Sequence, residues 1–132
     1  MKKFFIFCFL LLQSIVLNAQ ENSYATILVH DNMFVQIVFE SPIVSYKVGT
    51  ADAIDVVQTN NSITLQSIRM EDDTNLTVQT ADNFYYAFIL KHTKETPKLF
   101  YEIKKTEALN YNKIILAENA SRKERKEAKE IE

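Results

Sequence analysis

The chain has 132 residues, which is enough for one domain of ordinary size and too few for two. Apolar residues make up 47% of it and charged residues 24%, the composition of a folded globular protein and not of a disordered one. Because the formal net charge is −2 and nucleic-acid binding depends on Lys and Arg at phosphates, no nucleic-acid contact is expected.

The first nineteen residues have the layout of a secretory signal peptide. Lys2 and Lys3 form a positive start, and the run Phe4–Leu12 that follows is wholly apolar. This run is much shorter than the ~20 residues that span a bilayer, so a permanent membrane anchor is the weaker interpretation. We expect residues 1–19 to be removed after Ala19. The chain would then be exported to the periplasm or to the periplasmic face of the outer membrane.

The only cysteine, Cys8, lies in the middle of that apolar run. A lipoprotein carries its acylated cysteine at the end of the signal, so lipidation is the less favoured alternative. Removal of the signal would leave a chain with no thiol, no disulfide and no cysteine metal ligand.

Between residues 24 and 103, short β-branched and aromatic runs alternate with polar breaks. In Val35-Gln36-Ile37 and similar runs, apolar and polar side chains alternate, which indicates strands with one buried face. The spacing predicts an all-β fold, a small antiparallel β-sandwich of about seven to eight strands over residues 23–103. The expected strands are Tyr24–His30, Met33–Phe39, Ile43–Val48, Ala53–Gln58, Ser62–Ile68, Asn75–Thr80, Phe84–Lys91 and Leu99–Ile103.

Two further expectations concern strand order and turns. The run Phe84–Leu90 is apolar on both faces, which predicts a central strand paired with Leu76–Thr80 across the Asp82-Asn83 turn. Because Gly49 is the only glycine, Asn and Asp are expected to form the turns, since they are the next residues able to adopt positive φ.

Residues 104–132 are expected to form a charged helical tail. The run Ser121–Glu124 fits a capping box, with Ser at the cap and Glu three residues later, and so predicts a helix start there. Two interpretations remain open: a solvated helix that frays, or a tail that orders against a partner. Opposite charges four residues apart would support the helix weakly: Glu118 with Arg122, Lys123 with Glu127, and Lys126 with Glu130.

No residue pattern indicates catalysis, a cofactor or a metal. The two histidines, His30 and His92, each end an expected strand, where an exposed polar role is the usual one, and a zinc site needs three or four ligands. The acidic run Glu71–Asp73 lacks the spacing of a calcium loop and is interpreted as a solvated turn. We therefore expect a protein that is not an enzyme.

A more specific pattern is T-N-L-x-V-x-T-A-D-x-x-x-Y-x-F, within Thr74–Leu90. Together with Ser41–Gly49 and an export signal ending Asn-Ala-Gln, it resembles the N-terminal domain of the conjugative-transposon protein TraN family of Bacteroidetes. More distantly it is similar to the TrbG/CagX class, the β-sandwich subunit of type IV secretion. The residues that carry the pattern are Thr74, Asn75, Leu76, Val78, Thr80, Ala81, Asp82, Tyr86 and Phe88.

The resemblance implies a structural part of a conjugative, type IV secretion-like envelope apparatus. Its partners would be other envelope and conjugation proteins, and it would associate with the membrane through them. The chain departs from the family in two ways, since members usually continue into a second β domain and often have a glycine in the turn after Asp82. The oligomeric state does not follow from the sequence.

Three aromatic residues, Phe34, Tyr85 and Tyr101, are candidates for an interaction surface, although the same side chains could instead complete the core. Exposed sheet edges would offer strand addition to a partner. The alternative function is a periplasmic or surface module that binds a small ligand or glycan. It would need a concave patch of Tyr85, Tyr86 and Tyr101.

Overall fold

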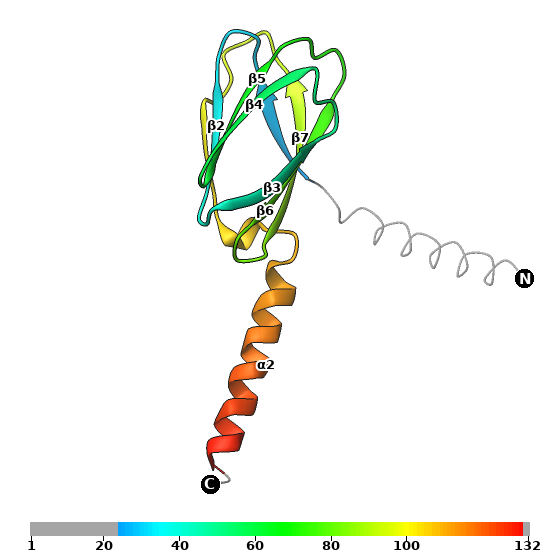
Figure 1. Ribbon diagram of the computed structural model, residues 1–132. Coiled ribbons are helices and arrows are strands. Elements are labelled where there is room, and N and C mark those ends of the chain that lie inside the picture. Colours follow the sequence, from blue (N-terminus) through cyan, green and yellow to red (C-terminus); the bar gives the residue numbers. More distant parts are fainter. Residues whose placement is uncertain (1–23, 131–132) are drawn as a thin grey trace, which may run out of the picture.

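The computed structural model describes residues 24–130, and the expected signal peptide at residues 1–19 lies outside them. All eight expected strands are confirmed, with small shifts at their ends. A short 3-10 helix, η1 (Lys105–Glu107), and a long helix, α2 (Tyr111–Glu130), follow them (Figure 1). The strands are β1 (Ala25–Val29), β2 (Val35–Phe39), β3 (Ile43–Val48), β4 (Ile54–Thr59), β5 (Ser62–Ser67), β6 (Thr74–Thr80), β7 (Tyr85–His92) and β8 (Phe100–Ile103).

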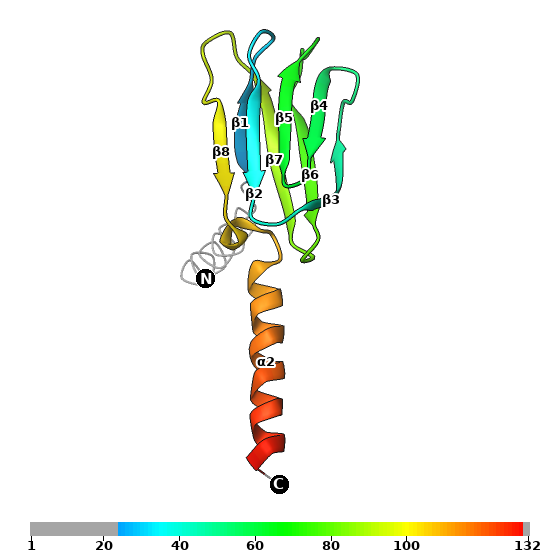
Figure 2. The same ribbon diagram turned by 60° about the vertical axis from the view of Figure 1, so that its left-hand side comes forward.

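The strands form two four-stranded sheets, one in the order β1-β7-β6-β3 and the other in the order β4-β5-β2-β8. The sheets face each other. The edge strands β1 and β8 lie on one side of the sandwich, and the edge strands β3 and β4 lie on the other (Figure 2). The prediction of a purely antiparallel fold is wrong, because β1 pairs with β7, and β2 with β8, in parallel. These partners are far apart in the sequence, so no tight turn fixes their relative direction, and side-chain alternation carries no information about it.

The inward faces of both sheets share one core. Phe39 of β2 is buried in it, with ring centroids 4.9 Å from Tyr86 and 6.2 Å from Phe88 on the opposite sheet. Each such side chain contributes about 1.5–3 kcal/mol when it is removed from water. The expected alternation is confirmed in β2 and β6, where every second residue is buried, beginning with Val35 and Leu76.

Strand β7 is central, as predicted, because it lies between β1 and β6. Tyr86, Phe88 and Leu90 enter the core, while the opposite face carries Tyr85 and the half-buried Ile89. Strand β7 is therefore apolar on both faces although only one of them is covered, which leaves an apolar strip on the outside of its sheet.

The prediction that asparagine serves in the turns is confirmed at two positions. Asn60, between β4 and β5, has φ 49°, and Asn83, between β6 and β7, has φ 66°. Gly49 does not adopt positive φ. A Cβ there would come within 2.6 Å of Thr74 Oγ1 and closer still to the Asn75 amide oxygen, so these two side chains would have to move to admit a larger residue.

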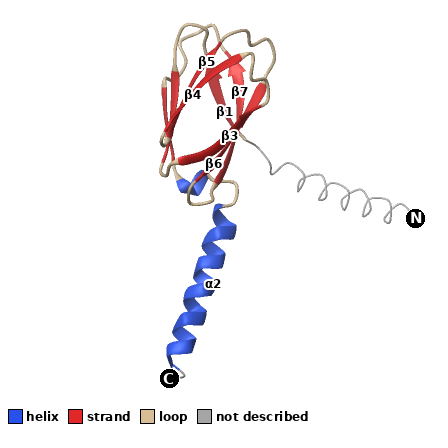
Figure 3. Cartoon of the chain, in the orientation of Figure 1, coloured by secondary structure: helices blue, strands red, loops and turns tan. Residues whose placement is uncertain are grey.

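The prediction of a helix start at Ser121 is wrong. Helix α2 is continuous from Tyr111, with Ser121 in its interior, because no glycine or proline follows Pro97 and nothing interrupts the helical run. The helix projects away from the sheets (Figures 1 and 3). Over residues 24–130, none of the helices has the length and apolar character that crossing a membrane requires.

Candidate interaction surfaces

The three aromatic residues expected at a surface do not come together. Phe34, just before β2, is 61% exposed, and Tyr85 is 47% exposed on the outside of the other sheet. Tyr101 points inward opposite Ile37 and packs against the core, with Lys98 Nζ 4.7 Å from its ring centroid. It is therefore only partly accessible.

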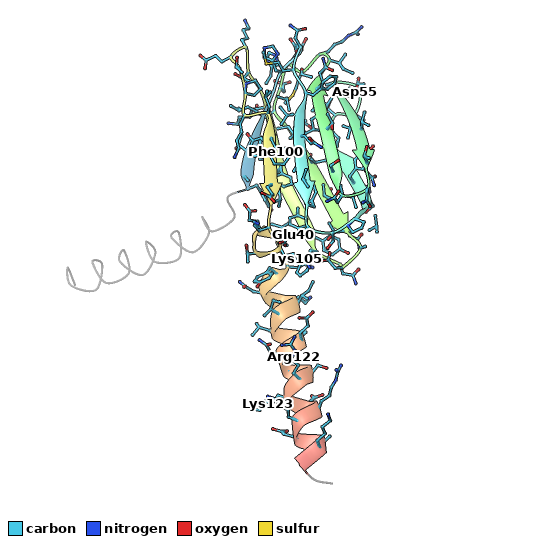
Figure 4. All side chains as sticks on the ribbon, turned by 90° about the vertical axis from the view of Figure 1, so that its left-hand side faces the viewer. Glu40, Asp55, Phe100, Lys105, Arg122 and Lys123 are labelled. Atoms are coloured by element: carbon cyan, nitrogen blue, oxygen red, sulfur yellow. The ribbon has the colours of Figure 1, made fainter. Side chains whose placement is uncertain are left out.

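Phe100 is the exposed aromatic residue of β8 that the sequence analysis did not single out. It is 50% exposed and pairs with Gln36 on the outer face, the same face as Phe34 (Figure 4). The alternation in β8 carried the necessary information, because a buried Ile103 places Tyr101 inward and Phe100 outward. Phe34 and Phe100 form what we call the β8-edge patch.

The proposed patch of three tyrosines is not formed, because Tyr86 is 2% exposed and belongs to the core. Burial, and then the nearby carboxylates of Asp82 and Glu40, raises the pKa of Tyr86 to about 12. Its phenol is consequently neutral at physiological pH. What remains around Tyr85 is a shallow groove of about 140 Å³ on the outer face. The groove is lined by Ser45, Tyr46, Lys47, Thr77, Val78, Gln79 and Tyr85.

A second opening lies between the edge strands β3 and β4. It is a cleft of about 410 Å³. Elsewhere between the same two strands, Gln58 Nε2 donates a hydrogen bond of 3.0 Å to the Ile43 carbonyl. Each of the two strands has a neighbour on one side only, so their outer backbone groups face the cleft mouth or solvent. Its lining residues are Tyr46, Val48, Ala51, Ile54, Asp55 and Val56.

The junction between the sheets and α2 is built on Asp82. One of its carboxylate oxygens accepts a 2.7 Å hydrogen bond from Ser41 Oγ and lies 3.3 Å from Lys105 Nζ, while the other accepts a bond from Thr80 Oγ1. Burial alone would raise the pKa of Asp82, but these bonds outweigh it and hold the pKa below its usual value. Asp82 therefore links β6, the β2–β3 loop and η1 as a carboxylate.

Asn110 makes a second connection at the same place. Its side-chain oxygen accepts a 3.0 Å hydrogen bond from the Tyr85 backbone N–H, and its amide nitrogen donates a 2.8 Å bond to the Asn83 carbonyl. Tyr111 then stacks on Phe84, with ring centroids 6.1 Å apart. We call Asp82, Lys105, Asn110 and Tyr111, with their partners, the joint.

Beyond the joint, α2 has few tertiary contacts. Ile114 is the last helix residue that packs against the core, and the side chains between Arg122 and Lys129 are all exposed (Figure 4). The expected helix-supporting ion pairs of Glu118 with Arg122 and of Lys123 with Glu127 do not form. The ion pairs among the described residues are Lys91–Asp73, His92–Asp31 and Lys105–Asp82.

The two histidines lie at the end of the sheets near Asp31. His92 Nε2 is 3.2 Å from Asp31 Oδ1, and His30 Nδ1 accepts a hydrogen bond of 2.9 Å from the Asn32 N–H. Within residues 24–130 no three acidic, histidine or cysteine side chains gather in the arrangement of a metal site. The run Glu71–Asp73 contributes only the pair of Asp73 with Lys91, at 3.6 Å.

Comparison with known proteins gives no assignment: no family model matches the chain, and no curated protein is similar to it. The surfaces described above therefore have to be interpreted from their own geometry.

Proposed function

We propose that this protein is an exported structural component of an envelope assembly, which works through protein–protein contacts and not as an enzyme. The observation that supports this best is α2, which is held by the joint over its first turns and is exposed beyond them. A helix without a packed face gains little stability from the rest of the domain. We interpret its fixed direction as a means of presenting it to another molecule.

The sheets offer the partner several places to bind. Four strands are edges with unpaired backbone groups on one side, and strand addition at such an edge combines backbone hydrogen bonds with side-chain pockets. The β8-edge patch places two exposed aromatic rings beside one of these edges. Aromatic residues are enriched at the energetically dominant points of protein interfaces.

We further propose that the assembly is a conjugative, type IV secretion-like apparatus, in which the protein meets the outer membrane through its partners. This rests on the resemblance of Thr74–Leu90 to the TraN family. In the fold this block is β6, the turn at Asn83 and β7, a hairpin in the middle of one sheet. The same block also supplies Asp82 and Tyr85 to the joint.

The second candidate function, binding of a small ligand or glycan, retains one supporting feature. The groove at Tyr85 combines an exposed aromatic ring with the polar side chains of Gln79 and Ser45. However, ligand sites of this kind usually enclose about 300–1,000 Å³, and the groove of about 140 Å³ is smaller than that.

The experiment is affinity purification of the tagged protein from gently cross-linked envelopes of cells that carry its gene. We expect a complex much larger than the monomer, with the same few envelope proteins in every preparation. Recovery of the protein only as a free monomer would contradict the proposal. Enrichment on an immobilised glycan, abolished by Tyr85→Ala, would favour the second candidate.

A further inference from the structure

The last two turns of α2 have an uneven distribution of charge. Arg122, Arg125, Lys126 and Lys129 follow the spacing i, i+3, i+4, i+7, which places all four on one side of a helix with 3.6 residues per turn. We call them the basic stripe. All four side chains are exposed, and none of them meets an acidic partner in an ion pair of the described residues.

The acidic residues of the same segment lie mostly elsewhere. Glu124 and Glu127 are both on the side opposite the basic stripe, as the helical repeat requires, whereas Glu130 is four residues after Lys126. Glu118 is on the stripe side, one turn before Arg122, and forms no ion pair with it. Among the described side chains, the four basic residues of the stripe therefore form no ion pair, although the whole segment is close to balanced.

We propose that the basic stripe binds an acidic segment of a partner protein, a helix or strand whose carboxylates match its spacing. This inference rests on the proposed function, because it names the chemistry of a partner in the assembly. The charge of the stripe is complementary to that of such a segment. Its two arginines present planar donors that suit carboxylates, and the joint fixes the direction of the helix that carries them. An assembly with several copies would add avidity to a weak individual contact.

Other anionic partners fit the helix less well. A helix that lies on a membrane buries an apolar face opposite its charged one, whereas the side of α2 opposite the basic stripe carries Glu124 and Glu127. Nucleic-acid surfaces that bind single strands combine basic with aromatic residues, and the segment from Arg122 to Lys129 has no aromatic residue. A second copy of the chain could offer the exposed run Glu71–Asp73, but its three acidic residues are consecutive and do not follow the i, i+3, i+4, i+7 spacing of the stripe.

The test measures binding of a synthetic acidic helix to the purified full-length protein. The probe is a peptide of about 20 residues, long enough to be helical, with glutamates at i, i+3, i+4 and i+7. A peptide of the same composition with the glutamates spread around the helix is the control. Binding is measured by fluorescence anisotropy at low and at physiological salt, together with vesicles that contain anionic lipid and a short DNA duplex as competing surfaces.

Two double variants, each of which removes two positive charges, form the matched pair. Arg122→Gln with Arg125→Gln changes the basic stripe, and Lys113→Gln with Lys123→Gln changes exposed lysines outside it. Glutamine keeps the helix propensity of these residues, which circular dichroism verifies. We expect the stripe variant to weaken peptide binding by about tenfold or more and the control variant to change it by about twofold or less. Physiological salt should weaken binding by the intact protein.

Equal weakening by both double variants, equal binding of the two peptides, or no binding at low salt would overturn the inference. Tighter binding to the vesicles or to the duplex, or self-association lost only in the stripe variant, would overturn it in favour of that other partner. If the stripe variant no longer binds the peptide but still forms the envelope complex, only this inference is lost. If the unaltered protein forms no complex at all, the proposed function itself is lost.

Discussion

The backbone N–H of Tyr85 donates a 3.0 Å hydrogen bond to the side-chain oxygen of Asn110, so the first residue of β7 is joined directly to the residue before α2. The second bond of the same side chain, to the Asn83 carbonyl, reaches the turn that precedes β7. Asn110 thus helps to set the orientation of the projecting helix relative to Tyr85, together with the 2.7 Å bond from the Leu109 N–H to the Tyr85 carbonyl.

Asn110→Ala removes both bonds and leaves the Tyr85 N–H without its partner. We expect a loss of about 1–2 kcal/mol in the free energy of docking of α2, since each neutral hydrogen bond is worth about 1 kcal/mol. Hydrogen exchange at the Tyr85 amide should become faster. Asn112→Ala, at an exposed position in the first turn of the same helix, is the control and should leave that exchange rate unchanged.

The turn residues make a second prediction. Asn60→Ala and Asn83→Ala place a residue that avoids positive φ at φ 49° and 66°, and each should cost about 1–2 kcal/mol in the free energy of unfolding. Glycine accepts the same backbone conformation, so Asn60→Gly should change it by only a few tenths. Urea unfolding measures both, and equal losses for alanine and glycine at Asn60 would show that φ is not the cause.

Asp82 predicts a dependence of stability on pH. Its pKa in the folded protein is lowered from 3.8, so the stabilisation is complete above that value and is lost as the pH falls below it. Asp82→Asn should therefore cost about 1 kcal/mol at pH 7, a modest figure because the side chain is 28% exposed. The difference from the original protein should shrink below pH 4. A difference that stays constant down to pH 2.5 would argue against the role of the carboxylate.

Phe39 and Phe34, five residues apart, allow a side chain that stabilises the core to be compared with one that is exposed for contact. Phe39→Ala opens a cavity beside Tyr86 and should cost about 3–5 kcal/mol. Phe34→Ala, at a side chain that is 61% exposed, should change the unfolding free energy by less than about 0.5 kcal/mol. Thermal unfolding compares them, and a large loss for Phe34→Ala would mean that this ring belongs to the core.

Side-chain alternation between polar breaks was sufficient to predict the eight strands, because it depends on local sequence and on one buried face. The run that is apolar on both faces predicted the central position of β7, and the single glycine predicted the asparagine turns. It could not predict the parallel pairing of β1 with β7, since that is decided by contacts between residues such as Thr26 and Ile89, far apart in the chain. The start of α2 was missed because a capping pattern at Ser121 has no effect where the preceding turn is already helical.

The candidate surfaces likewise include features that local sequence predicts and features that depend on contacts between distant residues. Of the candidate aromatic residues, Phe34 and Tyr85 are exposed, whereas Tyr86 and Tyr101 point toward the core on their strands. The joint could not be predicted, because Asn110 and Tyr85 meet only after the sheets have formed. The basic residues were recognised in the sequence, but their placement on one side depended on the uninterrupted helix.

The most direct measurement of the central claim is photo-cross-linking in cells that carry the gene, with a photoreactive phenylalanine at position 34, 85 or 100. We expect adducts of defined mass to the same envelope proteins from at least one of these positions, and an unaltered yield of the protein. Absence of adducts at all three positions, with the protein recovered as a free monomer, would contradict it.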